Sequence, residues 1–369
     1  MPQILLYSFI SVSAIQIIYW LIFLIVHAKK KNEVKIEPTI SNPVSIIVCA
    51  YNEFENLKLL IPILLKQVHE NFEVIIVNDR SDDETYDYLN AEKERHQNLQ
   101  VVNVDKVHDH INPKKYALTL GVKAAKNDLL LFTDADCKPN SEHWASEMSK
   151  TAEENTNFIL GYSPYEKHSG FLNALIRFET RLTGIFYTAF AMMGMPYMGV
   201  GRNLMYRKSM FMKNNGFNVH QNVTGGDDDL FVNQFALGKE TKVAIGANKL
   251  TWSIPKLTWK TYFYQKKRHL SVGKFYKFKG RLLLGLYSLT HVLFWLLLFI
   301  LAINKFYPEV LAGILFFRIL LVGLNIGVTS KKFGESMNIW TIPAFDFIYS
   351  FYLIIAGTMA IFTKKVTWR

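Results

Sequence analysis

Four long apolar stretches constrain the fold of this 369-residue chain more than any other feature. The first, residues 4–26, contains no charged residue and is long enough to span a bilayer. The other three lie near the end of the sequence, at about 282–303, 308–328 and 339–362. Because such stretches are stable only in apolar surroundings, the sequence predicts an integral membrane protein with one N-terminal and about three C-terminal membrane helices.

The charges beside the first stretch indicate its orientation. Lys29, Lys30 and Lys31 follow residues 4–26, whereas a cleaved signal peptide carries its basic residues in front of the apolar run. We therefore expect a retained anchor. Basic residues stay on the cytoplasmic side of a membrane, so Met1 faces out and the hydrophilic part faces the cytoplasm, on our interpretation at a bacterial inner membrane.

The same rule gives a conflict at the other end of the chain. Four crossings that begin outside would leave the basic tail "TKKVTWR", residues 363–369, outside as well. Either the last apolar stretch is re-entrant or interfacial, or the charge rule fails here. We expect a cytosolic C-terminus, where the tail meets lipid head groups.

The hydrophilic part is predicted to form one large α/β domain. Short β-branched runs alternate with helical stretches, the first two runs being Val44–Cys49 and Phe72–Val77. Further strands are expected at 99–104 and 129–133, with helices at 56–66, 83–94 and 114–125. Continuous apolar strands between helices are typical of a mostly parallel sheet covered on both faces, which binds ligands at the carboxyl ends of its strands. Two cysteines, Cys49 and Cys137, give no disulfide framework.

These features divide the chain into four parts. We expect an anchor at 1–30, the α/β domain at 40–250, basic interfacial helices at 251–281 and membrane helices at 282–369. No acidic residue occurs between Glu240 and Glu309, although that interval is rich in lysine and arginine. This basic surface favours contact with anionic lipid heads, with a catalytic role as the alternative. Because it adjoins a spanning helix, nucleic-acid binding is not expected.

Polar residues follow three of the predicted strands, in the sets Ala50–Glu53, Asn78–Asp83 and Asp134–Cys137. A single pair of acids at a strand end is commonly only solvated, but three polar strand ends on one edge favour a ligand site. Asp134 and Asp136, one residue apart, are suited to hold a hard divalent cation through oxygen ligands. Such a cation neutralises a diphosphate and stabilises the charge on a departing nucleoside diphosphate.

Other side chains near this edge have roles that the sequence leaves partly open. Asp79 suits hydrogen bonding to a base or ribose. Lys114 or Lys115 adds positive charge near phosphate or base, unless both lie on a solvated helix start. A transfer reaction also needs a proton acceptor, and "TGGDDDLF", residues 224–231, offers three consecutive acids behind two glycines. Acids also stabilise a helix N-terminus, so we expect one acid to face the ligand and another to cap.

Five stretches, in this order and spacing, resemble family 2 glycosyltransferases: "VSIIVCAYNEFENL", "VNDRSDDET", "TDADC", "MGVGRNLMYRKSMF" and "TGGDDDLFVN". More narrowly, they are similar to the membrane-anchored branch that includes ceramide glucosyltransferase-like enzymes and polysaccharide synthases. The resemblance covers about residues 43–279. It implies a Rossmann-like GT-A domain, a nucleotide-diphosphate sugar donor such as a UDP- or GDP-sugar, and inversion at the anomeric carbon.

The resemblance also implies roles for individual residues. Residues at the strand ends and on the following helix would bind the nucleotide sugar, namely Ala50, Tyr51, Glu53, Asp79, Lys114 and Asp134. Asp134 and Asp136 would hold Mg²⁺ or Mn²⁺ on the diphosphate. Asp227 matches the general base when the following "DL" anchors the alignment, and Asp228 is the alternative.

Membrane members of this family often carry a Q-x-x-R-W motif on a helix at the bilayer surface. This chain has "QKKRH", with His269 in place of the tryptophan. Gln265 and Arg268 lie one helical turn apart and are expected to contact diphosphate and acceptor together. The loss of an aromatic platform for sugar disfavours a processive synthase. The ending "VTWR" is similar to the W-R-G tail of ceramide glucosyltransferase-like chains.

Two charged residues interrupt the C-terminal apolar stretches. Arg318 lies inside the third stretch and Asp346 near the start of the fourth. Ionisable residues at membrane depth usually face protein and pair, so we predict that these two side chains meet across neighbouring helices. The alternative is that Arg318 extends to the membrane surface.

Three functions remain after these arguments. The first is a metal-dependent inverting glycosyltransferase that adds one sugar to a lipid or lipid-linked acceptor at the cytosolic face. The second is a processive synthase that moves a growing polysaccharide through its own helices. The third is a non-catalytic membrane scaffold that binds a nucleotide sugar only as a signal, against which the retained acids Asp134, Asp136 and Asp227 argue.

Overall fold

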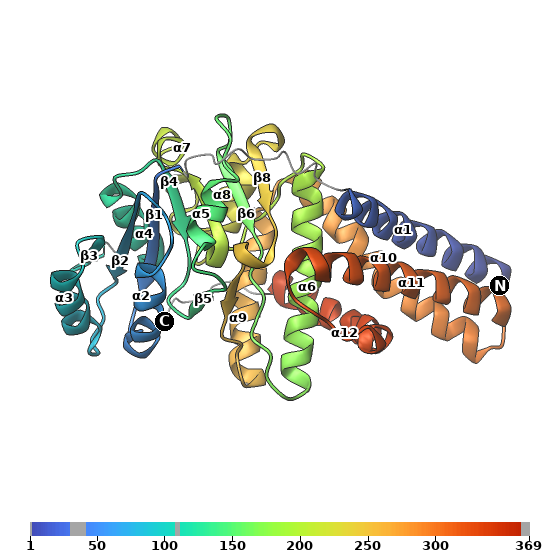
Figure 1. Cartoon of the computed structure of the whole chain (residues 1–369). Helices are drawn as coiled ribbons and strands as arrows, with labels where there is room; N and C mark the ends of the chain where they lie inside the picture. Colours follow the sequence, from blue (N-terminus) through green and yellow to red (C-terminus); the bar gives the residue numbers. More distant parts are fainter. Residues whose placement is uncertain (1, 30–41, 108–110, 363–369) are drawn as a thin grey trace.

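The computed structural model describes residues 2–29, 42–107 and 111–362, with side chains up to residue 359 (Figure 1). Lys30 and Lys31 of the basic cluster, and the tail at 363–369, lie outside the described residues. A sheet domain with helices on both faces adjoins a bundle of long apolar helices (Figure 1). The predicted combination of an α/β domain and membrane helices is confirmed.

The sheet has seven strands in the order β3-β2-β1-β4-β7-β6-β8. Its first half is parallel and consists of β1 (Val44–Ala50), β2 (Phe72–Asn78), β3 (Leu99–Asn103) and β4 (Leu129–Phe132). β7 (Leu204–Arg207) then runs antiparallel to both β4 and β6 (Phe158–Gly161), while β8 (Thr241–Ala244) is parallel to β6. The four predicted strands are confirmed to within one residue at each end.

The parallel strands read as continuous apolar runs because helices cover both faces. Along β1, Ile46 packs with α2 (Phe54–Leu65), while Ile47 on the other face packs with α4 (Pro113–Ala124). The face toward α2 also carries α3 (Thr85–Arg95) and the short α5 (Trp144–Ser149). The three predicted helices are present, and their ends differ from the prediction by one or two residues.

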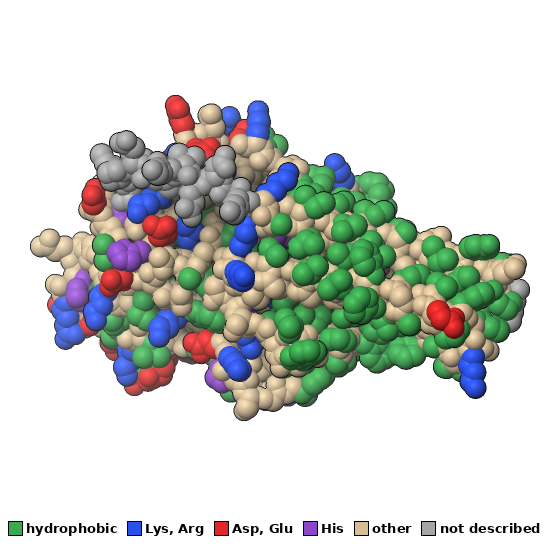
Figure 2. Space-filling model, turned by 45° about the vertical axis from the view of Figure 1, so that its right-hand side comes forward, with side chains coloured by type: hydrophobic (Ala, Val, Ile, Leu, Met, Phe, Trp, Pro, Cys, Tyr) green, Lys and Arg blue, Asp and Glu red, His purple; other side chains and the backbone are tan. Residues whose placement is uncertain are grey.

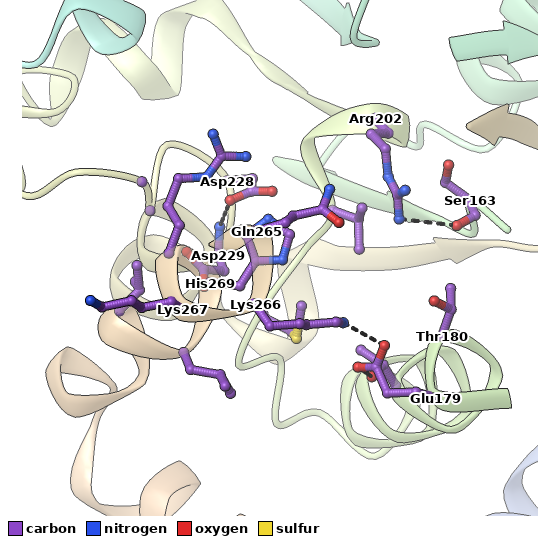
Figure 3. A pocket seen from close by; sticks show the side chains of 18 of the residues that line it. Ser163, Glu179, Thr180, Arg202, Asp228, Asp229, Gln265, Lys266, Lys267 and His269 are labelled. Atoms are coloured by element: carbon purple, nitrogen blue, oxygen red, sulfur yellow. Dashed lines mark hydrogen bonds and ion pairs between the residues drawn. The ribbon is translucent and has the colours of Figure 1, made fainter. Parts of the chain in front are cut away.

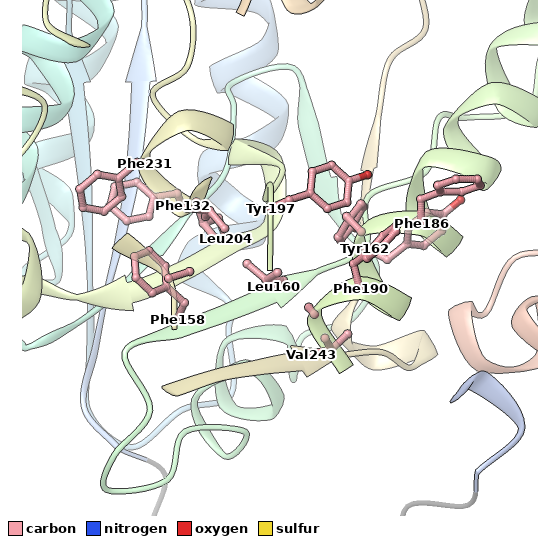
Figure 4. Packing of buried hydrophobic residues seen from close by; sticks show 14 of the residues in the cluster. Phe132, Phe158, Leu160, Tyr162, Phe186, Phe190, Tyr197, Leu204, Phe231 and Val243 are labelled. Atoms are coloured by element: carbon pink, nitrogen blue, oxygen red, sulfur yellow. The ribbon is translucent and has the colours of Figure 1, made fainter. Parts of the chain in front are cut away.

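An aromatic core lies beneath the antiparallel part of the sheet. Figure 4 shows Phe132, Phe158 and Phe231 grouped together, with Phe231 on the short helix α8 (Asp229–Phe235). The rings of Phe132 and Tyr206 stack with centroids 4.5 Å apart, and Phe231 lies 5.0 Å from Tyr206. Such packing holds α8, and the acids at its start, rigidly beside the end of β4.

Three helices and a second small sheet complete this domain. The helices are α6 (Phe171–Met192), α7 (Lys208–Lys213) and α9 (Trp259–Val272), of which α6 and α9 run beside the membrane bundle (Figure 1). The small sheet pairs β5 (Cys137–Pro139) antiparallel with β9 (Thr251–Ser253). The amide of Ile254 also donates to the carbonyl oxygen of Asp136 at 3.2 Å. The turn after β4 is thereby joined to the segment that leads into α9.

Four helices of the described part are long and apolar enough to cross a membrane, as the sequence predicts. They are α1 (Pro2–Ala28), α10 (Phe278–Ile303), α11 (Pro308–Phe333) and α12 (Ile342–Phe362), the last preceded by a short 3₁₀ turn at 339–341. Hydrophobic side chains cover the right-hand half of the molecule, which these helices form, whereas charged side chains gather on the left (Figure 2).

The direction of α12 differs from that of a simple fourth crossing. α10 runs away from the sheet domain, and Phe347 at the start of α12 contacts Phe299 in the distal part of α10, with ring centroids 5.1 Å apart. Further along α12, Tyr349 contacts His291, and the Tyr352 hydroxyl donates to Glu179 on α6. α12 therefore runs antiparallel to α10, although Phe345 in its first turn already packs on Phe178 of α6, with ring centroids 5.5 Å apart. Its later residues, up to Met359, line a cavity together with α9.

The predicted Arg318–Asp346 pair is confirmed. Both side chains are fully buried and form a salt bridge across α11 and α12. The Arg318 guanidinium also contacts Gln16 of α1 at 3.3 Å and His291 of α10 at 3.0 Å, and the Trp295 indole donates to Asp346 at 3.0 Å. The alternative, that Arg318 extends to the membrane surface, is wrong because its charge is neutralised inside the bundle.

Candidate active site

A cavity of about 1310 Å³ opens at the carboxyl ends of the parallel strands and extends to α9, α10 and α12. Its lining includes every residue that the sequence assigned to a site. At the strand ends and α4 these are Ala50, Tyr51, Glu53, Asp79, Lys114, Asp134 and Asp136, and from the later segments Asp227, Asp228, Gln265 and Arg268. Figure 3 shows the part of this cavity bounded by α6, α8 and α9.

The turn after β4 presents two carboxylates and a thiol at close range. Ligand atoms of Asp134, Asp136 and Cys137 all lie within 4.8 Å of one another. Burial, followed by the charges of Asp136 and Asp134, raises the pKa of the Cys137 thiol well above its ordinary value. The carboxylate oxygens of Asp134 and Asp136 are donors of the kind that suits Mg²⁺ or Mn²⁺.

Lys114 lies between two of the site's carboxylates. Its Nζ is 3.2 Å from an oxygen of Asp134 and 3.2 Å from an oxygen of Asp227. The side chain is placed by the start of α4, where Asn112 caps the helix by accepting from the Lys115 amide. Burial alone would lower the pKa of Lys114, but the two carboxylates raise it, so the ammonium remains charged.

The neighbouring Lys115 has a different role. Its Nζ donates to the carbonyl oxygens of His220 at 2.6 Å and Val223 at 2.9 Å. These bonds hold the segment that precedes the two glycines and the three acids. Of the two lysines that the sequence leaves open, Lys114 therefore faces the cavity, and Lys115 supports the loop beside it.

The three consecutive acids at the start of α8 have separate environments. Gly225 and Gly226 precede them with φ of 83° and 76°, a conformation that disfavours other residues. Asp228 is the N-cap of α8 and accepts from the amides of Asp229 and Gly201, each at 2.7 Å. Asp229 accepts from the Tyr276 hydroxyl at 2.8 Å.

Asp227 is left as the acid that pairs with Lys114. The expectation that one of the acids caps a helix is confirmed by Asp228. Burial would raise the pKa of Asp227, but Lys114 and then Lys115 lower it below its ordinary value. Burial and the charge of Asp227 instead raise the pKa of Asp228. Asp227 is thus the more readily ionised of the two.

The residues predicted to bind the nucleotide lie together at the ends of β1 and β2. The Asp79 amide donates to the Ala50 carbonyl at 2.7 Å, which joins the two strand ends. The Asp79 carboxylate is almost completely buried and accepts from Arg80 Nε at 2.9 Å. Tyr51 is 40% exposed, so its ring is open to a flat ligand. Burial raises the pKa of Glu53.

α9 brings the "QKKRH" motif into the cavity. Thr258 caps the helix by accepting from the Thr261 amide. Gln265 donates to the Tyr165 hydroxyl at 3.4 Å, and Arg268 lies beside Gly225. Burial, followed by the charges of Arg268 and Lys266, lowers the pKa of His269 well below its ordinary value. The residue that replaces the tryptophan is therefore a neutral imidazole.

Sequence reasoning missed three cavity residues. Arg202 donates to the Ser163 carbonyl at 3.3 Å, and its guanidinium lies 4.3 Å from the Tyr165 ring centroid (Figure 3). Glu179 of α6 forms a salt bridge with Lys266 of α9 (Figure 3). Two local motifs pointed to this region, because Arg202 lies in the quoted "GVGRN" stretch and Lys266 lies in "QKKRH". Glu179 comes from a distant segment without such a motif.

A mostly parallel sheet, with paired aspartates after one strand and a further aspartate before a helix across the cavity, defines the GT-A class of sugar-transferring folds. Family models agree. "Glycosyl transferase family 2" matches residues 45–214, and "Glycosyl transferase family group 2" matches residues 149–363. The chain belongs to the family 2 glycosyltransferases.

Two known proteins illustrate the similarity. A 4,4'-diaponeurosporenoate glycosyltransferase of Staphylococcus haemolyticus (strain JCSC1435) is 30% identical over 151 residues, which are 38% of this chain and 39% of the relative. The match thus spans well under half of the relative. The structure of mannosyltransferase PcManGT from Pyrobaculum calidifontis, in complex with GDP-Man and Mn²⁺, has a TM-score of 0.64 at 15% identity. It covers 99% of this chain and 100% of that one, a likeness of fold alone.

Proposed function

We propose that this protein is an inverting glycosyltransferase that moves a sugar from a nucleotide-diphosphate sugar to a lipid or lipid-linked acceptor at the cytosolic membrane face. One observation carries the proposal. The cavity that contains Asp134, Asp136 and Asp227 continues without interruption to the apolar helices α10 and α12. A polar donor and a membrane-borne acceptor can therefore reach the same carboxylates from opposite ends.

The donor occupies the strand-end side in this proposal. The nucleoside would be bound by Ala50, Tyr51, Glu53 and Asp79. Asp134 and Asp136 would hold Mg²⁺ or Mn²⁺. When bound, the cation neutralises the diphosphate and stabilises the charge that forms on it as it leaves. The PcManGT structure, which is a complex with GDP-Man and Mn²⁺, supports a donor and a metal of these kinds.

Asp227 is the proposed general base. Its carboxylate accepts the proton of the acceptor hydroxyl while that oxygen forms a bond to the anomeric carbon. The bond between this carbon and the donor phosphate breaks on the opposite face, and the nucleoside diphosphate leaves with the electron pair. Lys114 keeps Asp227 ionised before the proton transfer, because its ammonium lies 3.2 Å from the carboxylate.

α9 is proposed to hold the junction between donor and acceptor. Gln265 and Arg268 contact the diphosphate and the acceptor from one helix, as the resemblance of "QKKRH" to the family motif implies. The basic residues of 251–281 would rest on anionic lipid heads. The cytosolic orientation is supported by Lys29 after α1 and by the return of α12 toward the sheet domain.

Purified protein in lipid tests this proposal when it is supplied with a panel of UDP- and GDP-sugars, with and without Mn²⁺ or Mg²⁺. We expect metal-dependent release of nucleoside diphosphate that increases with a lipid extract and yields one added sugar per acceptor. A ladder of products would indicate the processive synthase instead. Donor binding without any acceptor-dependent product would favour the non-catalytic scaffold.

A further inference from the structure

The cavity changes in chemical character between its two ends. At the strand ends it is lined by charged side chains, including Asp134, Asp227 and Lys114. On the side formed by α10 and α12 the lining has no charged side chain. It contains Leu284, Leu353, Ala356 and Met359, together with the hydroxyl-bearing Tyr287, Ser288, Tyr349 and Tyr352. A ligand that matches both ends needs a polar head and an apolar body.

Two glycines leave space in the apolar wall. Gly285 of α10 and Gly357 of α12 both line the cavity, and a Cβ added to either would have no atom within 4 Å. Both helices are apolar and long enough to cross a membrane. The wall between them, which we call the α10–α12 groove, is therefore open and lies on two helices apolar enough to span a membrane.

A charged pair marks the boundary between the two ends. The Glu179 carboxylate accepts from Lys266 of α9, from Thr183 at 3.2 Å and from the Tyr352 hydroxyl of α12 at 3.3 Å. Figure 3 shows Lys266 extending from α9 toward Glu179, away from the acids of α8. Beyond Tyr352 along α12, the cavity-lining residues Leu353, Ala356, Gly357 and Met359 carry no hydrogen-bonding side chain.

We propose that the α10–α12 groove binds the hydrocarbon chain of a lipid, whose head group lies at Glu179 and Lys266 and whose hydroxyl points toward Asp227. The inference rests on the proposed function, because this lipid is the acceptor of that reaction. A sugar polymer fits the groove poorly, since its hydroxyl groups would lose water at Leu353, Ala356 and Met359 without finding partners.

Photo-labelling tests the groove without requiring turnover. The probe is hexadecanol carrying a diazirine in its chain, present in trace amounts in nanodiscs of phosphatidylethanolamine and phosphatidylglycerol that hold the full-length protein. Labelled residues are mapped by mass spectrometry. We expect label within 284–288 and 353–359 that unlabelled hexadecanol removes by competition. Label that is spread evenly over the outer faces of α1, α10 and α11, and that resists competition, would overturn the proposal.

Matched substitutions test where the hydrocarbon chain of the lipid binds. Gly285→Leu and Gly357→Leu fill the groove and should lower the competable labelling severalfold. Gly313→Leu is the control, because Gly313 on α11 also has nothing within 4 Å of an added Cβ but does not line the cavity. Equal labelling in all three variants would contradict the groove. If a groove variant fails to fold, the labelled positions of the wild type still decide.

Further measurements distinguish a failure of the lipid groove from a failure of the proposed glycosyltransferase activity. Asp227→Asn should label like the wild type although it loses transfer, so a failure of the proposed chemistry leaves the groove result intact. Conversely, transfer activity without competable labelling would retain the glycosyltransferase and reject the groove. Label from a photo-reactive chitotetraose at 353–359, in place of hexadecanol, would overturn the lipid assignment in favour of a polysaccharide path.

Discussion

The ammonium of Lys114 lies between the carboxylates of Asp134 and Asp227, 3.2 Å from an oxygen of each. One positive charge thus joins the proposed metal-binding turn to the proposed base. The arrangement has a direct consequence for proton transfer, because the base is ionised only as far as its neighbours favour the negative charge.

Replacing Lys114 should shift the pH dependence of transfer. A base acts when deprotonated, and Lys114 lowers the pKa of Asp227, which places the acidic limb of the wild-type profile at low pH. In Lys114→Met burial is opposed only by Lys115 and a backbone hydrogen bond, so the limb should move up by about 1 to 3 pH units. The profile of kcat against pH measures the shift.

The Asp227–Lys114 pair also makes the free energy of unfolding depend on pH. Because the pKa of Asp227 is lower in the folded chain than in the unfolded one, the stabilisation is present above the ordinary carboxyl pKa and is lost as the pH falls through the lowered value. If the acidic limb of the kcat profile did not move in Lys114→Met, Lys114 would not be the residue that keeps Asp227 ionised.

Asp227→Asn should lower turnover by roughly 10² to 10⁴-fold while donor binding and folding persist, because only the proton acceptor is removed. Calorimetric titration with the donor found in the panel checks the binding. Loss of donor affinity would move Asp227 to a binding role. Asp228→Ala is the matched control, since it removes an N-cap and a bond to Gly201 and should cost about 1 kcal/mol in thermal unfolding.

Asp136→Asn should lower transfer by about tenfold to a hundredfold or more, a loss seen even for groups that only support a metal ligand. Folding should change far less, because the Asp136 backbone bond to Ile254 is retained. Measurement of donor binding across a Mn²⁺ titration separates metal affinity from chemistry. Turnover at the wild-type rate would show that the metal assignment is wrong.

Arg318→Ala should destabilise the membrane bundle by about 3 to 5 kcal/mol, because it leaves the Asp346 carboxylate buried without its charge partner. The double variant with Asp346→Ala should lose less and give a higher membrane yield than Arg318→Ala alone. Thermal unfolding in detergent and the yield of folded protein report the order. The reverse order would mean that the two charges do not depend on each other.

A reporter at the C-terminus should lie in the cytoplasm. α12 runs antiparallel to α10 from Phe299 onward, and its residues up to Met359 line the cavity with α9, so the end of α12 and the sheet domain are expected on the same side. A C-terminal fluorescent protein should therefore glow, and a C-terminal alkaline phosphatase should be inactive. Phosphatase activity in intact cells would place the tail outside and restore four full crossings.

The sequence predicted the elements in which one local pattern dominates. β1 and β2 are short runs rich in β-branched residues, and the four membrane helices are defined by apolar length, so their positions needed no knowledge of contacts. The Arg318–Asp346 pair was also predictable, because a charge buried among apolar helices requires a partner.

Strand pairings and contacts that depend on residues far away in the sequence were not predictable in the same way. β7 runs antiparallel between β4 and β6, and nothing within Leu204–Arg207 specifies that neighbour or direction. The Glu179–Lys266 pair joins residues 87 positions apart. The separate environments of Asp227, Asp228 and Asp229 depend on Lys114, Gly201 and Tyr276, which arrive from three other segments.

The pairing of β5 with β9 fixes the position of the Asp134–Asp136 turn relative to α9. The backbone directly after Asp136 is hydrogen-bonded to the strand that leads into α9, so the carboxylates stand at a set height above the surface on which that helix is proposed to rest. A hydroxyl carried too deep in the bilayer, or too far out in the water, would miss Asp227 even with the correct chemistry. Acceptors would then be sorted by depth as well as by structure.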